Sequence, residues 1–296
     1  MFKKFTSFVI LLFVVSVPAT SVLAATKKKQ AGPIQASLVV DSKTGKVLHA
    51  YNAKRKIYPA SLTKIMTIYL IFEALESGKL TLNHKLQVSK YATEALPSKL
   101  YLRAGERISV RDAILALTVK SANDVARVVG ENIAGSEQKF ARLMTIRARQ
   151  LGMNNTNFTN ASGWHDPKQV TTAVDLAKLS MAIKRDFPQY YHFFRQTNFA
   201  FKGKVITGHN RVTATYPGAE GLKTGYHTPA GCNLVTAATR GNKSLVGIVI
   251  GRKSSAVRDR HMVELLDQHF GVRHPTVKAI GKPKRKSIKL ASRHKS

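Results

Sequence analysis

The chain has 296 residues, 44% of them hydrophobic and 22% charged, so it has enough apolar material for a sizeable core and is not the sequence of a disordered protein. Its formal net charge of +32 at pH 7 favours an anionic partner. The single cysteine, Cys232, excludes an internal disulfide, and we expect it to be a small buried side chain.

The first two dozen residues have the pattern of an export signal. Two lysines precede an apolar run at residues 8–17, and Val22-Leu23-Ala24 offers small residues for cleavage. An uncleaved anchor is the alternative, but the run is shorter than the ~20 residues of a membrane span. We expect a signal peptide over 1–24, a basic linker over 25–33, and export to the periplasm or cell envelope.

The next segments predict a strand pair and a buried helix. Residues 36–40 and 46–50 have strand composition and flank the turn Ser42-Lys43-Thr44-Gly45, which predicts a hairpin. Over residues 61–77 apolar side chains cover most of the helical surface, so this helix is expected to be buried, with Gly78 placed to end it.

The central part of the chain has a helical pattern. Ser109 with Asp112 and Thr172 with Asp175 have the spacing of capping boxes, each followed by apolar residues at helical spacing. We therefore expect an all-helical lobe at about residues 80–200.

The last third returns to strands before a final helix. Residues 233–239 and 244–250 are β-rich runs split by Gly241-Asn242, and residues 257–270 have helical spacing. This order predicts an α+β fold: an antiparallel sheet flanked by helices, with the helical lobe inserted, rather than a doubly wound parallel sheet.

The C-terminal stretch is strongly basic. From Lys278 to Lys295 it carries eight lysines and arginines and no acid, which is typical of a disordered tail, expected over 272–296. Export removes nucleic acid as a physiological partner. An anionic envelope surface is the expected partner of the tail.

Three short motifs occur in order along the chain: Ser61-Leu62-Thr63-Lys64, Ser121-Ala122-Asn123 and Lys223-Thr224-Gly225. Each is common by itself. Ser136-Glu137-Gln138-Lys139 imitates the first motif and Lys43-Thr44-Gly45 the third, and neither needs a function, so context must separate motif from imitation.

The first motif has the context of a catalytic pair. Ser61 begins the buried helix, where free backbone N–H groups favour negative charge on an attacking oxygen. Lys64 lies on the same helix face three residues later, among apolar residues. Burial and a second cation such as Lys223 are expected to lower the pKa of Lys64, so that the neutral amine can accept the proton of a nucleophilic Ser61.

The other two motifs supply candidate substrate groups. Ser121 is expected to relay a proton to the leaving amine and Asn123 to hold the substrate's peptide group. Lys223 and Thr224, expected on an edge strand, can bind a terminal carboxylate, while Gly225 allows a close backbone approach.

Other chemistries have no support in the sequence. There is no Gly-rich phosphate loop, no His-Glu-x-x-His and no Cys-x-x-Cys, so we expect neither a cofactor nor a metal. Adjacent His165 and Asp166 rarely face the same way, and we expect a turn near Pro167 rather than a dyad.

The motifs and their flanks resemble one family. Pro59-Ala60-Ser61-Leu62-Thr63-Lys64-Ile65-Met66-Thr67, Ser121-Ala122-Asn123-Asp124 and Gly221-Leu222-Lys223-Thr224-Gly225 look like the low-molecular-mass D-alanyl-D-alanine carboxypeptidases, which are penicillin-binding proteins. The similarity runs over residues 34–271, the expected catalytic domain, and includes stretches resembling Leu151-Gly152-Met153 to Ala161-Ser162-Gly163.

The resemblance implies a sheet of about five strands beside a helical region, with the active site at their junction. It also implies an oxyanion hole made by the backbone N–H groups of Ser61 and Tyr226, and an arginine for the terminal carboxylate. Arg258 is the choice by spacing, with Arg252 and Arg260 close enough to remain open. The implied partners are peptidoglycan stem peptides, cleaved after acylation of Ser61, and β-lactams as substrate mimics.

Several alternatives stay open. Shorter relatives act as endopeptidases on crosslinks, and a β-lactamase needs a glutamate for rapid deacylation. Among the candidates, Glu131 and Glu137 have the pattern of helix-surface acids and Glu220 belongs to the third motif. A non-catalytic, basic envelope-binding protein is the alternative from another class.

Overall fold

The main element of the fold is a five-stranded antiparallel sheet in the order β2-β1-β9-β8-β7. The structure is a computed structural model that describes residues 32–272, so the predicted signal segment, most of the linker and nearly all of the basic tail lie outside the described residues. The strands are β1 (Ala36–Asp41), β2 (Val47–Tyr51), β7 (Ala219–His227), β8 (Gly231–Arg240) and β9 (Lys243–Arg252).

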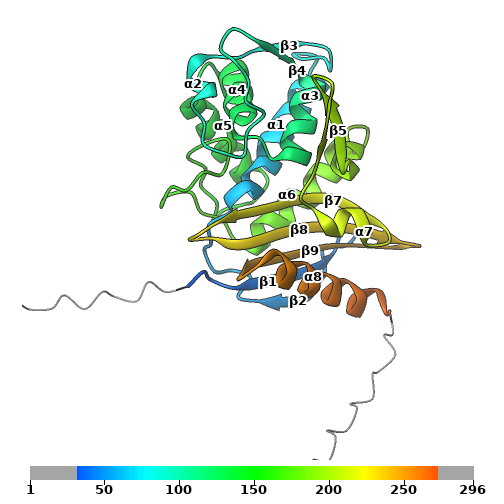
Figure 1. Ribbon diagram of the computed structural model, residues 1–296. Coiled ribbons are helices and arrows are strands. Elements are labelled where there is room, and N and C mark those ends of the chain that lie inside the picture. Colours follow the sequence, from blue (N-terminus) through cyan, green and yellow to red (C-terminus); the bar gives the residue numbers. More distant parts are fainter. Residues whose placement is uncertain (1–31, 273–296) are drawn as a thin grey trace, which may run out of the picture. The chain divides into compact units, whose positions relative to one another are not determined.

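Helices pack on the sheet and fill the region beside it (Figure 1). The longer ones are α1 (Lys64–Glu76), α4 (Asn123–Ala134), α5 (Glu137–Gln150), α6 (Ala173–Asp186) and α8 (Ser255–Phe270). Short ones are α2 (Lys90–Thr93), α3 (Val110–Leu115) and α7 (Arg211–Thr215), with 3₁₀ turns at Ala60–Thr63 and Tyr191–Arg195 and a π turn at Ala116–Lys120.

The sheet has a different helical layer on each face. Side chains alternate along a strand. Leu38 of β1 and Ile248 of β9 accordingly pack in the large core cluster with α1 and α6, whereas their neighbours Val39 and Val249 pack with α8. The predicted α+β architecture, an antiparallel sheet flanked by helices, is therefore confirmed.

The predicted helical region is largely helical, with one difference. Ser109 and Thr172 cap α3 and α6 by accepting from the backbone N–H of the residue three positions later, as the capping-box spacing predicts. However, the region also contains a two-stranded sheet of β3 (Lys85–Gln87) and β4 (Arg107–Ser109), so it is not all-helical. Strands of three residues are too short to give a recognisable alternation.

A further hairpin follows the helical region, formed by β5 (Asn198–Phe201) and β6 (Lys204–Thr207).

None of the helices within residues 32–272 is long and apolar enough to cross a membrane.

Helix α1 is the centre of the core. Every one of its residues except Glu73 and Glu76 is buried, which agrees with the predicted buried helix. It contacts the sheet through β7 and the helical region through α4, α5 and α6. The start of α1 therefore lies where the sheet and the helical region meet.

Candidate active site

Ser61 lies in a tight 3₁₀ turn that leads directly into α1. The preceding residue, Ala60, has a φ of 48°, an uncommon backbone conformation for a residue with a Cβ. Ser61 is partly exposed, and its Oγ lies 3.1 Å from the Nζ of Lys64. The three-residue spacing thus brings the two side chains together on one face, as the sequence predicts.

Lys64 is completely buried and has three polar contacts. Besides Ser61 Oγ, its Nζ donates to Asn123 Oδ1 at 2.7 Å and to the Ser162 carbonyl oxygen at 2.6 Å. Burial, and next the charge of Lys223, hold the pKa of Lys64 well below its usual value of 10.5. The structure therefore has the buried, low-pKa lysine that the sequence predicts.

The contacts of Lys64 also orient its lone pair. A neutral amine has two hydrogens and one lone pair, and the oxygens of Asn123 and Ser162 can only accept. Both hydrogens are then used, so the lone pair is left for the hydroxyl of Ser61. This is the arrangement that a general base for a serine nucleophile requires.

The second motif lies in the bend between the π turn and α4. Ser121 has φ 63° and ψ 37°, a left-handed conformation that costs free energy for any residue except glycine. Its Oγ is buried, without a hydrogen-bond partner among the described residues. A strained, unpaired hydroxyl is unusual in a folded core and suits a functional group.

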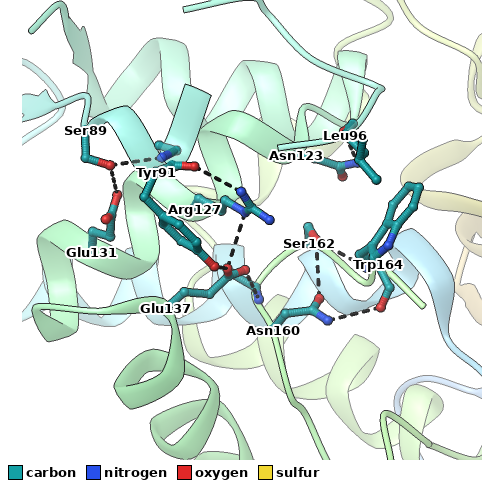
Figure 2. Close-up of polar contacts among 12 residues, drawn as sticks. Ser89, Tyr91, Leu96, Asn123, Arg127, Glu131, Glu137, Asn160, Ser162 and Trp164 are labelled. Carbon is teal, nitrogen blue, oxygen red and sulfur yellow. Dashed lines mark hydrogen bonds and ion pairs between the residues drawn. The ribbon is translucent and has the colours of Figure 1, made fainter. Parts of the chain in front are cut away.

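Asn123 is occupied on both sides of its amide. Its Oδ1 accepts from Lys64, and its Nδ2 donates to the carbonyl oxygen of Leu96 at 2.8 Å (Figure 2). The residue was predicted to hold the substrate. In this structure it fixes Lys64, with one amide hydrogen left over for a further acceptor.

The third motif lies on β7, an edge strand of the sheet as predicted, and packs against the turn that carries Ser61. Lys223 is buried, and burial together with the charge of Arg258 lowers its pKa to about 7. A Cβ added at Gly225 would lie 3.0 Å from the Pro59 carbonyl oxygen and 3.1 Å from the Ser61 nitrogen. Only glycine fits this approach easily, because the protein's own backbone fills the space.

Thr224 borders a cavity of about 250 Å³ beside β7. The cavity is also lined by Leu222 and by residues 207–211, which include His209. Desolvation, and then the cations of Lys223, Lys120 and Arg258, lower the pKa of His209. Sequence reasoning did not find His209, which belongs to none of the three motifs.

The two residues assigned only by resemblance have different surroundings. The Tyr226 side chain is exposed, while its backbone is paired with β8 opposite Cys232. Arg258 is buried on α8, close enough to Lys223 to lower its pKa, and its guanidinium binds Asp259 at 2.7 Å. Arg252 instead binds Gln35 and His261, so of these two arginines only Arg258 is coupled to the motif.

The loop at residues 160–164 is the part of the site that sequence reasoning missed. It offers a backbone carbonyl to Lys64, and such a contact leaves no signal in residue type. Gly163, with φ 85°, crosses so close to Ala60 that an added Cβ would lie 1.9 Å from the Ala60 carbonyl oxygen. The clash requires glycine at this position. Gly163 is therefore the residue through which the sequence could have pointed to this loop.

The interpretation of Glu137 as a surface acid is wrong. Its side chain is only 5% exposed, and it accepts from the hydroxyl of Tyr91 and the backbone N–H of Ala161. The neighbouring residues 138 and 139 are exposed, as the helical pattern predicts, but the distant loop covers Glu137. Glu131 is partly exposed and accepts from Ser89 at 2.6 Å.

The imitation motifs have structural explanations. Ser136 caps α5 by accepting from the N–H of Lys139, and Asp41 accepts from the backbone of Lys43 and Thr44 in the hairpin turn. Cys232 is buried and free, as predicted.

His165 and Asp166 have separate partners in the structure. Asp166 accepts from the backbone of Lys168, as expected of a turn, while the ring of His165 packs against Tyr58 and His227. Within residues 32–272 no group of three or more histidine, cysteine or carboxylate side chains could hold a metal ion.

A buried lysine hydrogen-bonded to a serine at a helix start has the geometry that nucleophilic acyl transfer requires. Comparisons with known proteins identify the family. Residues 24–254 match the family model of the D-alanyl-D-alanine carboxypeptidases. The carboxypeptidase DacC of Escherichia coli K12 is 34% identical over 261 residues, which are 85% of this chain and 65% of that protein.

Two further relatives extend the comparison. A D-alanyl-D-alanine endopeptidase of Pseudomonas aeruginosa is 31% identical over 84% of this chain and 82% of its own length. The ampicillin-bound crystal structure of penicillin-binding protein D2 from Listeria monocytogenes matches at a TM-score of 0.71 and 29% identity, covering 78% of this chain and 96% of that one.

The chain belongs to the D-alanyl-D-alanine carboxypeptidase family, and the resemblance noted in the sequence is confirmed. It spans less than two thirds of the length of the first carboxypeptidase relatives it matches, at 60–65% of each.

Proposed function

We propose that this protein is a serine-type carboxypeptidase that removes the terminal D-alanine from peptidoglycan stem peptides through an acyl-enzyme on Ser61. The observation that carries the proposal is the fully buried Lys64, whose Nζ lies 3.1 Å from Ser61 Oγ and whose other two polar contacts are pure acceptors. Family membership supplies the substrate class.

In the first step Ser61 Oγ attacks the carbonyl carbon between two D-alanines while its proton passes to Lys64 Nζ. The resulting oxyanion is bound by the backbone N–H groups of Ser61 and Tyr226. Loss of one such donor typically costs about 2.7–4 kcal/mol of transition-state stabilisation. The close packing of Gly225 on the Ser61 nitrogen supports this role, because it brings the two N–H groups onto neighbouring backbones.

In the second step the C–N bond breaks and the departing D-alanine takes a proton from the Lys64 ammonium, relayed by Ser121. The unpaired, buried Oγ of Ser121 supports this relay, since it is free to accept one proton and donate another. Water then attacks the ester, again losing its proton to Lys64, and releases the shortened peptide and free Ser61.

The terminal carboxylate of the substrate is proposed to bind Lys223, Thr224 and Arg258, with Asn123 donating its remaining amide hydrogen to the peptide chain. Two coupled cations support this assignment, because a buried Lys223 whose pKa is near 7 gains from a bound anion. Thr224 adds a hydroxyl at the border of the adjacent cavity.

Rapid hydrolysis of a penicilloyl ester, as in a β-lactamase, has less support. Both oxygens of Glu137 are engaged, with Tyr91 and with Ala161, and those of Glu220 are engaged with Lys184 and Arg195. Both carboxylates are therefore held by other protein groups, which counts against either of them as the base for a water. β-Lactams are therefore proposed to acylate Ser61 and to leave slowly.

We further propose that the protein acts in the cell envelope after export. The pattern of residues 1–24 supports a signal peptide, and the basic residues of 272–296 support binding to an anionic envelope surface. Both segments lie almost wholly outside the described residues, so these proposals rest on sequence.

The proposal is tested by measuring D-alanine release from a synthetic stem pentapeptide ending in D-alanyl-D-alanine, with Ser61→Ala as the matched control. We expect release by the wild type and none by the variant. Cleavage of a crosslinked stem-peptide dimer at a higher kcat/KM than the pentapeptide would assign an endopeptidase instead. Equal release by wild type and Ser61→Ala would contradict the proposal.

A further inference from the structure

The buried carboxylate of Glu137 is not used in the mechanism above. It lies at the N-terminal end of α5, and its partners come from three other parts of the helical region (Figure 2). Tyr91 O–H donates to Oε2 at 2.5 Å, Arg127 Nε lies 3.4 Å from the same oxygen, and Ala161 N–H donates to Oε1 at 3.0 Å. The carboxylate is thus fixed from both sides.

The contact with Ala161 leads directly to the proposed base. Ala161 also accepts a hydrogen bond from Thr67 Oγ1 at 2.7 Å through its carbonyl oxygen. The next residue, Ser162, accepts from Lys64 Nζ at 2.6 Å. Glu137 on one side, and Thr67 and Lys64 of α1 on the other, therefore determine where the Ser162 carbonyl lies.

The position of that carbonyl decides which way Lys64 faces. If the Ser162 oxygen moved away, a hydrogen of the neutral amine would be free to turn toward Ser61, and the lone pair would turn from it. A displacement of about 1 Å at a reacting pair can cost on the order of 100-fold in rate. The rate gained by placing residues 161–162 precisely can therefore offset the free-energy cost of burying the Glu137 carboxylate.

Glu137 also acts on Lys64 through its charge. The charged groups that face Lys64 come from three elements: Lys223 on β7, Asp124 on α4 and Glu137 on α5. The lysine lowers the pKa of Lys64, and the two acids raise it. Glu137 therefore acts on both the orientation and the proton affinity of Lys64, which a residue that only stabilises the fold would not do.

We propose that Glu137 is a positioning residue for Lys64, acting through its hydrogen bond to the 161–162 backbone and through its charge. It does not touch the reacting atoms, because Tyr91 and Ala161 occupy its oxygens. The inference rests on the proposed function, in which neutral Lys64 is the base for acylation of Ser61.

The test is the pH dependence of Ser61 acylation by a penicillin, followed by intact mass, in wild type, Glu137→Gln and Glu131→Gln. Glu131 is the matched control, since it is a carboxylate of the same region that is bonded to Ser89 and is not among the charges acting on Lys64. The acylation rate should rise with pH as Lys64 loses its proton.

Loss of the Glu137 charge favours the neutral amine, so the midpoint of this rise should move to lower pH in Glu137→Gln. The maximal rate should also fall, by about tenfold or more, as the loop loosens. Glu131→Gln should keep both values. An unchanged midpoint in Glu137→Gln would overturn the proposal even if the rate fell, because a merely structural residue would affect only the amount of competent protein.

A second variant covers the case in which Glu137→Gln does not fold. Glu137→Asp keeps the charge but shortens the side chain by one methylene, so its carboxylate no longer reaches the Ala161 N–H that Glu137 binds at 3.0 Å. The midpoint should then stay near the wild-type value while the maximal rate falls. A maximal rate equal to that of the wild type in this variant would overturn the proposal. Absence of any adduct on the wild type would instead remove the proposed function, and this inference with it.

Discussion

Lys64 Nζ lies 3.1 Å from Ser61 Oγ, and the only other hydrogen-bond partners recorded for it in residues 32–272 are two carbonyl-type oxygens. The pair forms because a 3₁₀ turn runs into α1 and places residues three apart on one face. Burial then keeps the pKa of the amine low. Helix geometry and desolvation together produce a base next to a nucleophile.

The first prediction concerns this base. Lys64→Met should slow acylation of Ser61 by a penicillin by about 10²–10⁴-fold, the usual contribution of a general base. Lys139→Met is the matched control, since Lys139 occupies the same place in the imitation motif, is exposed, and should have no effect. The rate is read from intact mass over time. Similar rates in the two variants would show that Lys64 is not the base.

The second prediction separates strain from chemistry at Ser121. Ser121→Ala and Ser121→Gly both remove the proposed relay hydroxyl, so both should lower D-alanine release to the same extent. Only glycine relieves the left-handed backbone at φ 63°, and the glycine variant should be more stable than the alanine variant by about 1 kcal/mol. Denaturant unfolding measures the difference. A glycine variant that keeps wild-type activity would exclude the relay.

The third prediction concerns the crossing of Gly163 over Ala60. Gly163→Ala should destabilise the protein by at least about 2 kcal/mol more than Gly203→Ala, because the new Cβ would collide with the Ala60 carbonyl. Gly203 is the matched control, with a similar positive φ of 73° and no atom within 4 Å of an added Cβ. Equal losses in thermal or denaturant unfolding would mean that the loop does not pack on the Ser61 turn.

Much of this site follows from sequence because its residues obey local rules. Ser61 and Lys64 share a helix face, and Lys223 belongs to a short motif that lies on the edge strand β7. The fold followed from the same kind of pattern: the order of strand pair, buried helix, helical insert, strand group and final helix was sufficient to predict an antiparallel sheet flanked by helices. Very short strands such as β3 were not predicted from the sequence pattern.

The rest depends on contacts between distant segments. The Ser162 carbonyl binds Lys64 across 98 residues of sequence, and any residue type supplies a carbonyl. Glu137 has the helical pattern of an exposed acid and is covered only because a loop folds over it. His209 reaches the charged region through the packing of residues 207–211 beside β7. The spacing of apolar and polar residues along one segment cannot predict contacts with a distant segment.

The fourth prediction concerns the stability cost of Lys223. Burial lowers its folded pKa to about 7, against about 10.5 unfolded, so between these values the unfolded chain binds more protons and the free energy of unfolding rises with pH. Below about pH 7 Lys223 is charged in both states, and the full free-energy cost of burying its charge lowers the stability. Lys223→Met should remove the part of this slope that Lys223 contributes and leave the part due to Lys64, whose pKa is also lowered. It should stabilise the protein at pH 7 by up to ~4 kcal/mol, while abolishing activity.

Denaturant unfolding of wild type and Lys223→Met from pH 7 to pH 9.5 tests this, since the tyrosines begin to titrate above that range. An equal slope in both proteins would show that Lys223 is protonated when buried. The exposed Lys202→Met, in which the lost side chain binds Glu106 at the surface, serves as the control and should keep the slope.

The central claim, that Ser61 is the nucleophile, is tested most directly by incubating the purified protein with a penicillin and following its intact mass, with the modified peptide mapped by fragmentation. The account predicts one adduct per chain, located on Ser61, persisting over the time course and absent from Ser61→Ala. No adduct on the wild type, or an adduct that survives in Ser61→Ala, would contradict it.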